Sequence, residues 1–298
     1  MPSRHRALAV AVAAIWGVNF VVIDLGLREV PPLVLTALRF LACAVPLVFL
    51  VPRPTSRLRH VVAYGLALGV VKFGLLFTAM AHGMPAGLAS LVIQAQALFS
   101  VALAALALGE RVRSAQAAGV AVASGGIALL ALGRGEHAPL AGLLLTVGAA
   151  LAWACANIVV RLSGERRPLS LLAYSSLVPP LPLLAIAGAQ DGLAATVRAL
   201  THLSWTALLA VAFISYASTL LGFGVWNRLL AEHGVAKVAP YGLLVPVFGL
   251  GAAAVVLGEP VTPAVATAAA VVLFGLFLVG RPVRVSPGLP AGSTATGR

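Results

Sequence analysis

The sequence predicts an all-α membrane protein in which ten transmembrane helices form two inverted five-helix repeats around a central cavity. Three observations predict this fold. Of the 298 residues, 61% are hydrophobic and only 9% are charged, whereas an ordinary soluble domain carries roughly 25% charged residues. The hydrophobic residues fall into ten runs, each near the ~20 residues that a helix needs to cross a bilayer. Short motifs also recur between the two halves, which indicates an internal repeat.

Proline, glycine and charged residues separate the ten runs and predict the helix boundaries. The first run continues to about Leu27 without a clear cleavage site of small residues, so we expect a retained helix rather than a signal peptide. Pro85 opens the fourth run, and Pro246 lies inside the ninth, where it is expected to bend or break the helix. The expected spans are, in order, residues 7–27, 33–51, 61–82, 86–108, 114–132, 140–161, 170–189, 204–226, 236–257 and 262–280.

Two sets of residues in the first half have counterparts in the second. Trp16 and Asn19 in the first helix are echoed by Trp153 and Asn157 in the sixth, and the Leu-Gly-Glu sequence that begins at Leu108 recurs after the ninth helix. Each half would hold five helices. Because five is an odd number, the second half enters the membrane from the opposite side, as in many secondary transporters.

The repeats are expected over residues 1–132 and 133–281, with five helices in each. Residues 282–298 contain too few apolar side chains to form a core, so we expect a disordered cytoplasmic tail. The chain therefore has room for one membrane unit and no separate soluble domain.

Basic residues are distributed unequally between the two sides of the membrane. With the N-terminus in the cytoplasm, fifteen of the 20 Lys and Arg residues lie on the cytoplasmic side and three, Arg28, Arg134 and Arg198, on the other. This bias predicts that both termini are cytoplasmic. The net charge of +12 is spread among apolar runs, so it reflects sidedness and predicts a lipid bilayer, not nucleic acid, as the partner.

Signatures of soluble enzymes are missing from the sequence. The chain has no HExxH, GxSxG, P-loop or paired CxxC motif, so we expect neither an enzyme nor direct ATP-driven pumping. Cys43 and Cys155 lie inside apolar runs, where they are expected to act as small apolar filler. A membrane-embedded enzyme would need acids or histidines clustered within the spans, and only Asp24 is an acid clearly within one. No metal and no cofactor are expected.

Three ionisable side chains, Asp24, Arg39 and Lys72, lie within the expected spans, where each costs about 2.5–3.5 kcal/mol on insertion scales. Asp24 and Arg39 are placed symmetrically about the turn between the first two helices, so they should lie at equal depth. We predict a structural ion pair between them, with a direct substrate or proton role as the alternative. Lys72 lies near the middle of the third span. It either is satisfied by backbone carbonyls or Asp24, or binds a carboxylate in a wet cavity.

Neutral polar side chains concentrate in the first, fourth, sixth and eighth helices, whereas the fifth and tenth are almost wholly apolar. This contrast predicts a polar-lined cavity formed by the former helices. Hydrogen bonds between helices are the alternative role for each of these side chains. The candidate substrate-binding residues are Trp16, Asn19, Lys72, Gln94, Gln96, Trp153, Asn157 and Tyr216.

These residues resemble the drug/metabolite transporter superfamily, in particular its EamA family. The resemblance rests on Trp16-Gly17-Val18-Asn19-Phe20, Pro31-Pro32-Leu33 through Leu38-Arg39-Phe40, GMPAGLASLVIQAQALFS from Gly83 to Ser100, Gly109-Glu110-Arg111, Trp153-Ala154-Cys155 with Asn157, and Leu244-Val245-Pro246-Val247. It implies a ten-helix transporter of the bacterial inner membrane with inverted halves. The positions that match are Trp16, Asn19, Arg39, Gln94, Gln96, Trp153 and Asn157. Asp24 and Lys72 depart from the family's pattern, which bears on the substrate more than on the fold.

The resemblance also implies a function, namely export of small amino-acid-like metabolites of the O-acetylserine and cysteine type. The expected mechanism is alternating access without ATP. Export of another small solute, such as a nucleobase, a larger amino acid or a toxic organic compound, is the first alternative, and a membrane-embedded enzyme is the second. Proton coupling and the choice between a monomer and a homodimer stay open at this stage.

Overall fold

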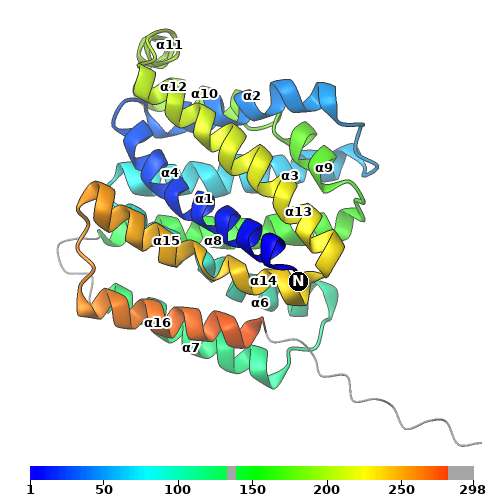
Figure 1. Ribbon diagram of the computed structural model, residues 1–298. Coiled ribbons are helices and arrows are strands. Elements are labelled where there is room, and N and C mark those ends of the chain that lie inside the picture. The colour runs from blue at the N-terminus through cyan, green and yellow to red at the C-terminus, as the bar shows by residue number, and fades with distance from the viewer. Residues whose placement is uncertain (133–138, 281–298) are drawn as a thin grey trace, which may run out of the picture.

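The computed structural model describes residues 1–132 and 139–280, and all regular secondary structure in those ranges is helical (Figure 1). Nine helices in the described ranges are long and apolar enough to cross a membrane. A tenth, α16 (Pro263–Val279), has 17 residues. The predicted membrane fold is thus confirmed. The expected tail, residues 282–298, lies outside the described residues.

Several spans are built from more than one helical segment. The first half contains α1 (Ser3–Leu27), α2 (Pro32–Leu50), α3 (Leu58–Tyr64), η1 (Gly65–Phe73), α4 (Gly74–Ala81), α5 (Ala86–Val92), η2 (Ile93–Ala95), α6 (Gln96–Leu108) and α7 (Ser114–Leu132). The second half contains α8 (Leu140–Ser163), α9 (Pro168–Ser175), α10 (Pro180–Asp191), α11 (Leu193–Thr201), α12 (Trp205–Ala212), η4 (Phe213–Leu221), α13 (Gly222–His233), α14 (Val235–Gly242), α15 (Val245–Ala252), η5 (Ala253–Leu257) and α16.

Two kinds of irregular segment occur in corresponding spans of the two halves. The seventh span is also interrupted, between α9 and α10, whereas the second span is the continuous helix α2. The third span carries a π-helix at η1 and the eighth carries one at η4. The fourth span changes to a 3-10 helix at η2, and the ninth is interrupted by a turn just before Pro246. Proline fits the first turn of a new helix because its missing N–H is not needed there. The break expected at Pro246 is therefore confirmed, whereas the irregularity in the fourth span lies further along than Pro85.

Helix α11 is a described helix that lies outside the ten spans expected from the sequence. It occupies Leu193–Thr201 in the connection between the seventh and eighth spans, and Figure 1 shows it standing apart at the end of the bundle. The segment is too short to span a bilayer, so hydropathy alone gave no reason to separate it from a loop.

Glycines allow close helix pairs in this bundle. A Cβ atom at Gly17 of α1 would lie 2.7 Å from the backbone nitrogen of Gly249 in α15. A Cβ at Gly119 of α7 would lie 2.6 Å from the carbonyl oxygen of Gly275 in α16. Small residues at such positions let helix backbones approach closely, which is how membrane helices gain packing energy. The pair α7 and α16 lies along one side of the bundle (Figure 1).

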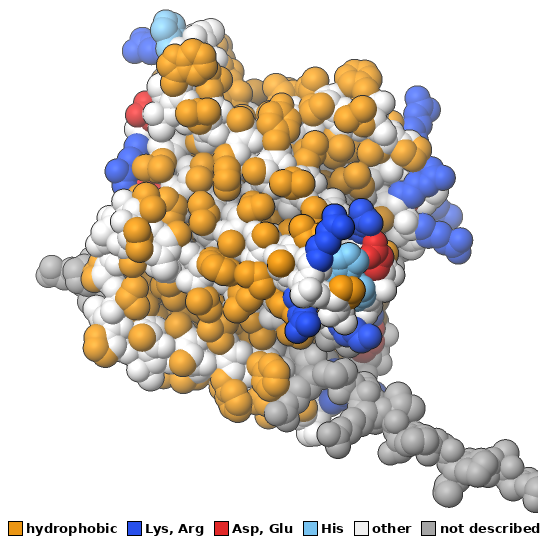
Figure 2. All heavy atoms as spheres, in the orientation of Figure 1, with side chains coloured by type: hydrophobic (Ala, Val, Ile, Leu, Met, Phe, Trp, Pro, Cys, Tyr) orange, Lys and Arg blue, Asp and Glu red, His pale blue; other side chains and the backbone are white. Residues whose placement is uncertain are grey.

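The surface is apolar across the middle and charged at the two ends. Figure 2 shows hydrophobic side chains covering most of the visible face, with Lys and Arg gathered mainly at the end that holds the N-terminus. We call this end, which contains residues 51–57, 109–113 and 164–167, the N-terminal end, and we call the other the opposite end. An apolar band between two polar ends fits a bilayer.

Glu165 joins two connections at the N-terminal end. Its carboxylate accepts hydrogen bonds from Thr55 Oγ1 and from the Ser56 backbone N–H, both at 2.8 Å, and from the Arg167 backbone N–H at 2.9 Å. Burial raises the pKa of this carboxyl, but the hydrogen bonds outweigh burial and lower the pKa to about 2. The carboxylate thus ties residues 51–57 to residues 164–167.

Candidate functional site

Arg39 and Lys72 are charged side chains buried inside the bundle, each only 4% exposed. Arg39 comes from α2, and its Nη2 donates a hydrogen bond to Thr219 Oγ1 of η4 at 3.0 Å. Ser215 of η4 donates to the Arg39 backbone carbonyl, also at 3.0 Å. The Arg39 Nη1 atom is buried without a hydrogen-bond partner among the described residues.

Aromatic rings surround these two cations. The Arg39 Cζ atom lies 3.8 Å from the centroid of the Phe73 ring, and Lys72 Nζ lies 3.1 Å from the same centroid. Lys72 Nζ is also 4.6 Å from the Trp153 ring. These distances are within the range in which a ring face attracts a cation. Lys72 and Phe73 are consecutive residues of the π-helical segment η1, so this one segment supplies both the cation and the ring of their contact.

The predicted ion pair between Asp24 and Arg39 is not formed. The Asp24 carboxylate instead accepts hydrogen bonds from Arg28, at 2.8 Å from Nη2 and 3.1 Å from Nε. Arg28 follows the last residue of α1 and lies four residues after Asp24, so the pair forms at the end of that helix, at the opposite end of the bundle. Equal depth did not bring Asp24 and Arg39 together, because α2 packs mainly against α10, α4 and η4 and has few contacts with α1.

Trp16 and Asn19 lie on the interior side of α1. Trp16 Nε1 donates a hydrogen bond to the Ser218 backbone carbonyl at 2.9 Å, and the indole packs against Phe223 and Trp226 with ring centroids 5.2 and 5.1 Å away. Asn19 is buried, and its Oδ1 atom has no hydrogen-bond partner among the described residues. A polar atom buried in this way is expected to have a partner in the working protein.

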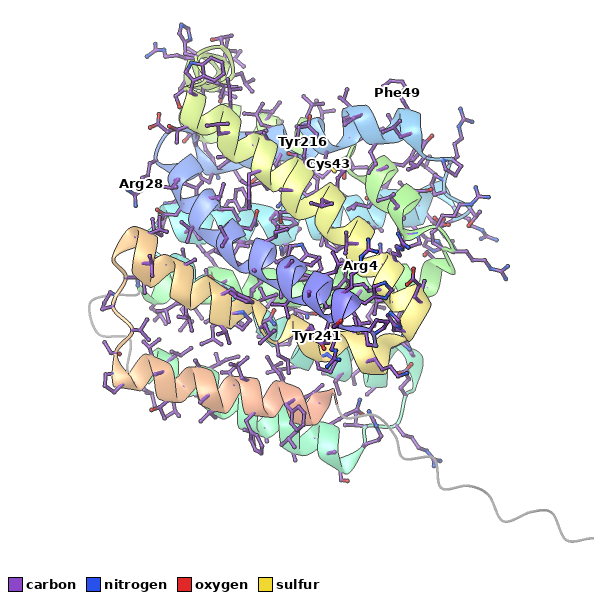
Figure 3. All side chains as sticks on the ribbon, viewed as in Figure 1. Arg4, Arg28, Cys43, Phe49, Tyr216 and Tyr241 are labelled. Atoms are coloured by element: carbon purple, nitrogen blue, oxygen red, sulfur yellow. The ribbon has the colours of Figure 1, made fainter. Side chains whose placement is uncertain are left out.

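Two of the predicted polar residues from different helices bond to each other. Asn157 Nδ2 donates to Gln96 Oε1 at 3.1 Å and to Ser100 Oγ at 3.2 Å. Gln94 is half-buried in η2, next to the change of helix type in the fourth span. Tyr216 is 46% exposed and lies on the outward side of η4 in Figure 3. The structure does not bring Tyr216 into this group, because Ser215 and Thr219 are the residues of η4 that face Arg39.

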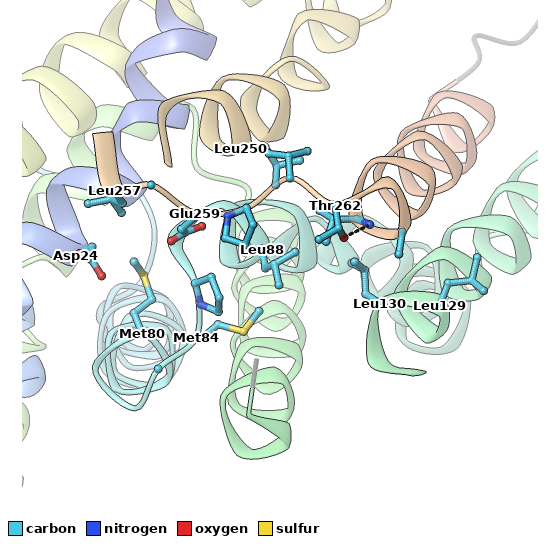
Figure 4. A pocket seen from close by; sticks show the side chains of 17 residues that line it. Asp24, Met80, Met84, Leu88, Leu129, Leu130, Leu250, Leu257, Glu259 and Thr262 are labelled. Atoms are coloured by element: carbon cyan, nitrogen blue, oxygen red, sulfur yellow. Dashed lines mark hydrogen bonds between the residues drawn. The ribbon is translucent and has the colours of Figure 1, made fainter. Parts of the chain in front are cut away.

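A cavity of about 400 Å³ opens at the opposite end of the bundle (Figure 4). The Glu259 carboxylate lies in it and accepts hydrogen bonds from the Ala86 and Gly87 backbone N–H groups, at 2.7 and 2.9 Å. Burial raises the pKa of Glu259, and Asp24 raises it further, while the two N–H groups lower it; the net direction is upward. The residues that line the cavity include Asp24, Met80, Met84, Leu88, Leu129, Leu130, Leu250, Leu257, Glu259 and Thr262.

Glu110 stands in the matching turn of the first half. Gly109 and Gly258 both adopt left-handed conformations, with φ of 68° and 70°, and the backbone N–H groups of Glu110 and Glu259 bond to Ala104 and Ala253 respectively. The Glu110 carboxylate, however, pairs with Arg161 of α8. Glu259 was not among the predicted site residues. The repeated Leu-Gly-Glu sequence is the signal that could have drawn attention to it, but the sequence does not indicate that Glu259 contacts α5.

The two helical segments of the fourth span, α5 and α6, have different packing partners, and so do those of the ninth span, α14 and α15. On the side of the opposite end, α5 packs against α15 and α1. On the side of the N-terminal end, α6 packs against α8, whereas α14 packs against α1 and α13. The fourth and ninth spans therefore contact each other through α5 and α15, the segments on the same side as Glu259.

One group of potential metal ligands among the described residues lies at the N-terminal end. Ligand atoms of His5, Glu232 and His233 fall within 4.8 Å of one another, and His5 Nδ1 lies 2.6 Å from His233 Nε2. Arg228 binds the Glu232 carboxylate at 2.7 Å and so competes with a cation for the only acid of the group. We interpret this group as a link between α1 and α13.

Comparison with known proteins identifies the family. The model of the EamA-like transporter family matches residues 6–132 and 140–281. Over 298 residues the chain is 41% identical to a probable amino-acid metabolite efflux pump of Salmonella typhimurium, covering 96% of this chain and 100% of that protein. It is 39% identical to a protein of the same description from Escherichia coli, covering 93% and 95% of the two chains.

More distant matches agree with this result. A probable terminal-alkyne amino-acid exporter of Streptantibioticus cattleyicolor is 29% identical and covers 78% of this chain and 76% of its own. A crystal structure with 20% sequence identity matches with a TM-score of 0.62 over 93% of this chain and 96% of that chain, which shows a shared fold. The chain belongs to the EamA-like transporter family, and it is a membrane transporter rather than an enzyme.

Proposed function

We propose that this transporter exports small amino-acid-like metabolites, of the O-acetylserine and cysteine type, across the bacterial inner membrane by alternating access. The observation that carries the proposal is the placement of Lys72, a cation inside the bundle whose charged group contacts aromatic rings and makes no ion pair among the described residues. A substrate carboxylate supplies the missing negative charge. The descriptions of relatives in three bacteria as amino-acid efflux pumps or exporters support the same substrate class.

The proposed substrate site combines residues from both halves. Lys72 and Trp153 already contact each other, and Gln96 and Asn157 are hydrogen-bonded. Asn19 has a buried acceptor atom without a partner. Gln94 and Trp16 complete the proposed site. Gln94 lies at the change of helix type in the fourth span, and Trp16 lies on the interior side of α1. Tyr216 is not part of it.

We further propose that the two halves, residues 1–132 and 133–281, are inverted repeats. Three pairs of features support this. π-helical segments occur in the third and eighth spans, interruptions occur in the fourth and ninth, and left-handed glycines precede Glu110 and Glu259. The family model also matches the chain twice, once in each half. Repeats of this kind place a substrate site where interrupted helices meet, near the middle of the membrane.

The two glutamates give the repeats a way to alternate. With the N-terminal end in the cytoplasm, Glu259 holds the start of α5 beside the outer cavity and so keeps that cavity separate from Lys72, while Glu110 is engaged by Arg161 instead of the start of α14. In the outward-open state the roles are exchanged: Glu110 holds α14 and Glu259 releases α5. The positive dipole at a helix N-terminus favours either contact.

A labelling experiment tests this exchange. Glu259→Gln removes the charge that holds α5, so a cysteine introduced at Leu88 in the outer cavity should react several-fold faster with a membrane-impermeant thiol reagent. Glu110→Gln is the matched control, because it changes the corresponding turn at the other end and should not raise the labelling rate. Equal rates in the two variants would contradict the proposed exchange.

Flux through the purified protein tests the function itself. The protein in sealed liposomes should move O-acetylserine and cysteine faster than protein-free liposomes, with the panel extended to nucleobases, larger amino acids and toxic organic compounds, and run with and without a pH gradient. Flux of a nucleobase or an organic toxin without flux of any amino-acid derivative would replace the proposed substrate class by the alternative one.

A further inference from the structure

Three side chains that can bind a metal ion meet at the N-terminal end of the bundle. His5 lies in the first turn of α1, and Glu232 and His233 are the last two residues of α13. His5 Nδ1 lies 2.6 Å from His233 Nε2 and 3.5 Å from Glu232 Oε2, and His233 Nε2 lies 3.9 Å from the same oxygen. The three ligand atoms therefore form a compact triangle that joins the first span to the eighth.

The size of this triangle fits a zinc ion. Zinc binds imidazole nitrogens and carboxylate oxygens at about 2.0–2.2 Å in a tetrahedral arrangement, which places neighbouring ligand atoms about 3.3 Å apart. The two distances to Glu232 Oε2 are near this value, and the two nitrogens need to separate only from 2.6 Å to about 3.3 Å. The hydrogen that the nitrogens now share moves to the other nitrogen of its own ring, because a metal takes the lone pair of each ligating nitrogen.

A cavity beside the triangle has room for a fourth ligand. It has a volume of about 110 Å³, and His5 and Glu232 line it together with the apolar side chains of Leu8, Val225 and Leu229. A zinc site with three protein ligands takes water at its fourth position, and a cavity of this volume is large enough for a water molecule. The side chains of His5 and Glu232 are 24% and 36% exposed, so an ion in solution reaches the site without opening the bundle.

Two arginines beside the site oppose the binding of a cation. Arg4 and Arg228 both line the cavity, and Arg228 Nε donates a hydrogen bond to Glu232 Oε1 at 2.7 Å. This bond uses one carboxylate oxygen and leaves Oε2, the oxygen nearest to both histidines. Arg228 therefore weakens the site without blocking it, and removing its charge should strengthen the binding of a cation.

We infer that His5, Glu232 and His233 form a binding site for a divalent transition-metal ion, with Zn²⁺ as the ion that fits best, and that the ion ties α1 to α13. Imidazole and carboxylate together are ligands that suit zinc. The inference goes beyond the proposed transport function and holds whichever solute the protein moves. The sequence alone does not indicate the site, because His5 and His233 are 228 positions apart.

Titration with zinc tests the site on the full-length protein, purified in detergent without a polyhistidine tag. Calorimetry with ZnCl₂ should show one ion bound per wild-type chain. His5→Gln should weaken binding at least tenfold, whereas His82→Gln, which alters an exposed histidine at the end of α4, should leave the affinity unchanged. Arg228→Gln should tighten binding several-fold, because it removes the competing charge from Glu232.

A thermal measurement on the unmodified protein covers the case in which His5→Gln does not fold. ZnCl₂ should raise the melting temperature of the wild-type protein, and an excess of EDTA should reverse the shift, because the ion binds the folded chain in preference to the unfolded one. MgCl₂ should have no effect, since Mg²⁺ prefers oxygen ligands. An unshifted melting temperature with zinc, an equal shift with MgCl₂, equal zinc affinity in wild type and His5→Gln, or no gain in Arg228→Gln would overturn the inference and leave the transport proposal intact.

Discussion

Single residues in this transporter are recognisable from the sequence, but their partners are not. Arg39 and Lys72 stand out because charges are rare in membrane spans, and both are buried. Asp24 was expected to bind Arg39 and binds Arg28 instead, because the rotation of each helix about its axis decides which side chains meet. That rotation is set by packing across the whole bundle. For the same reason the bond between Gln96 and Asn157 could not be predicted from their positions in the chain.

Glu165 gives a prediction about acid stability. Its pKa is about 2 in the folded protein against an ordinary value of 4.5, so its contribution to stability is present above about pH 4.5 and is lost as the pH falls toward 2. Glu165→Gln should lower the melting temperature at neutral pH, and the difference from wild type should shrink on acidification. Glu29→Gln, an exposed acid, serves as the control. A difference that stays constant down to pH 3 would contradict the assigned role.

Helical elements were predicted more accurately than single contacts. The expected and observed spans coincide within four residues, because the length of an apolar run is fixed by bilayer thickness. The end of the eighth span is the exception, since it was expected at residue 226 and lies at His233. The π-helices η1 and η4 were not predicted, because a change from i→i+4 to i→i+5 hydrogen bonds leaves the apolar pattern of a membrane helix almost unaltered. The π-helix η1 also makes a close tertiary contact. A Cβ at Gly69 in η1 would lie 2.0 Å from Pro179 Cγ.

Two adjacent glycines test the packing of α7 against α16. A Cβ at Gly126 would lie 2.7 Å from Val272 Cγ2 and 2.9 Å from its backbone nitrogen, whereas a Cβ at Gly125 would have nothing within 4 Å. Gly126→Ala should therefore destabilise the protein by about 1–3 kcal/mol through overpacking. Gly125→Ala should be neutral or slightly stabilising, because alanine favours a helix. Thermal unfolding in detergent compares the two, and equal melting temperatures would show that the helices separate easily.

The distribution of charge predicts how the whole molecule is oriented in the membrane. Basic side chains gather at the N-terminal end (Figure 2), which supports a cytoplasmic location for that end. In a background with Cys43→Ala and Cys155→Ala, an impermeant thiol reagent added to intact spheroplasts should label Arg198→Cys. It should label Arg57→Cys only after the membrane is opened. The opposite pattern would invert the topology and the direction assigned to the two glutamates.

The central claim is that a buried cation in the membrane domain binds the exported substrate, and the two lysines of the chain test it most directly. Lys72→Gln is compared with Lys237→Gln, which alters an exposed lysine, by measuring flux in liposomes and melting temperature on the same preparations. Lys72→Gln should reduce flux at least tenfold while the melting temperature stays near that of wild type, and Lys237→Gln should change neither. Wild-type flux and apparent affinity in a folded Lys72→Gln variant would contradict the account.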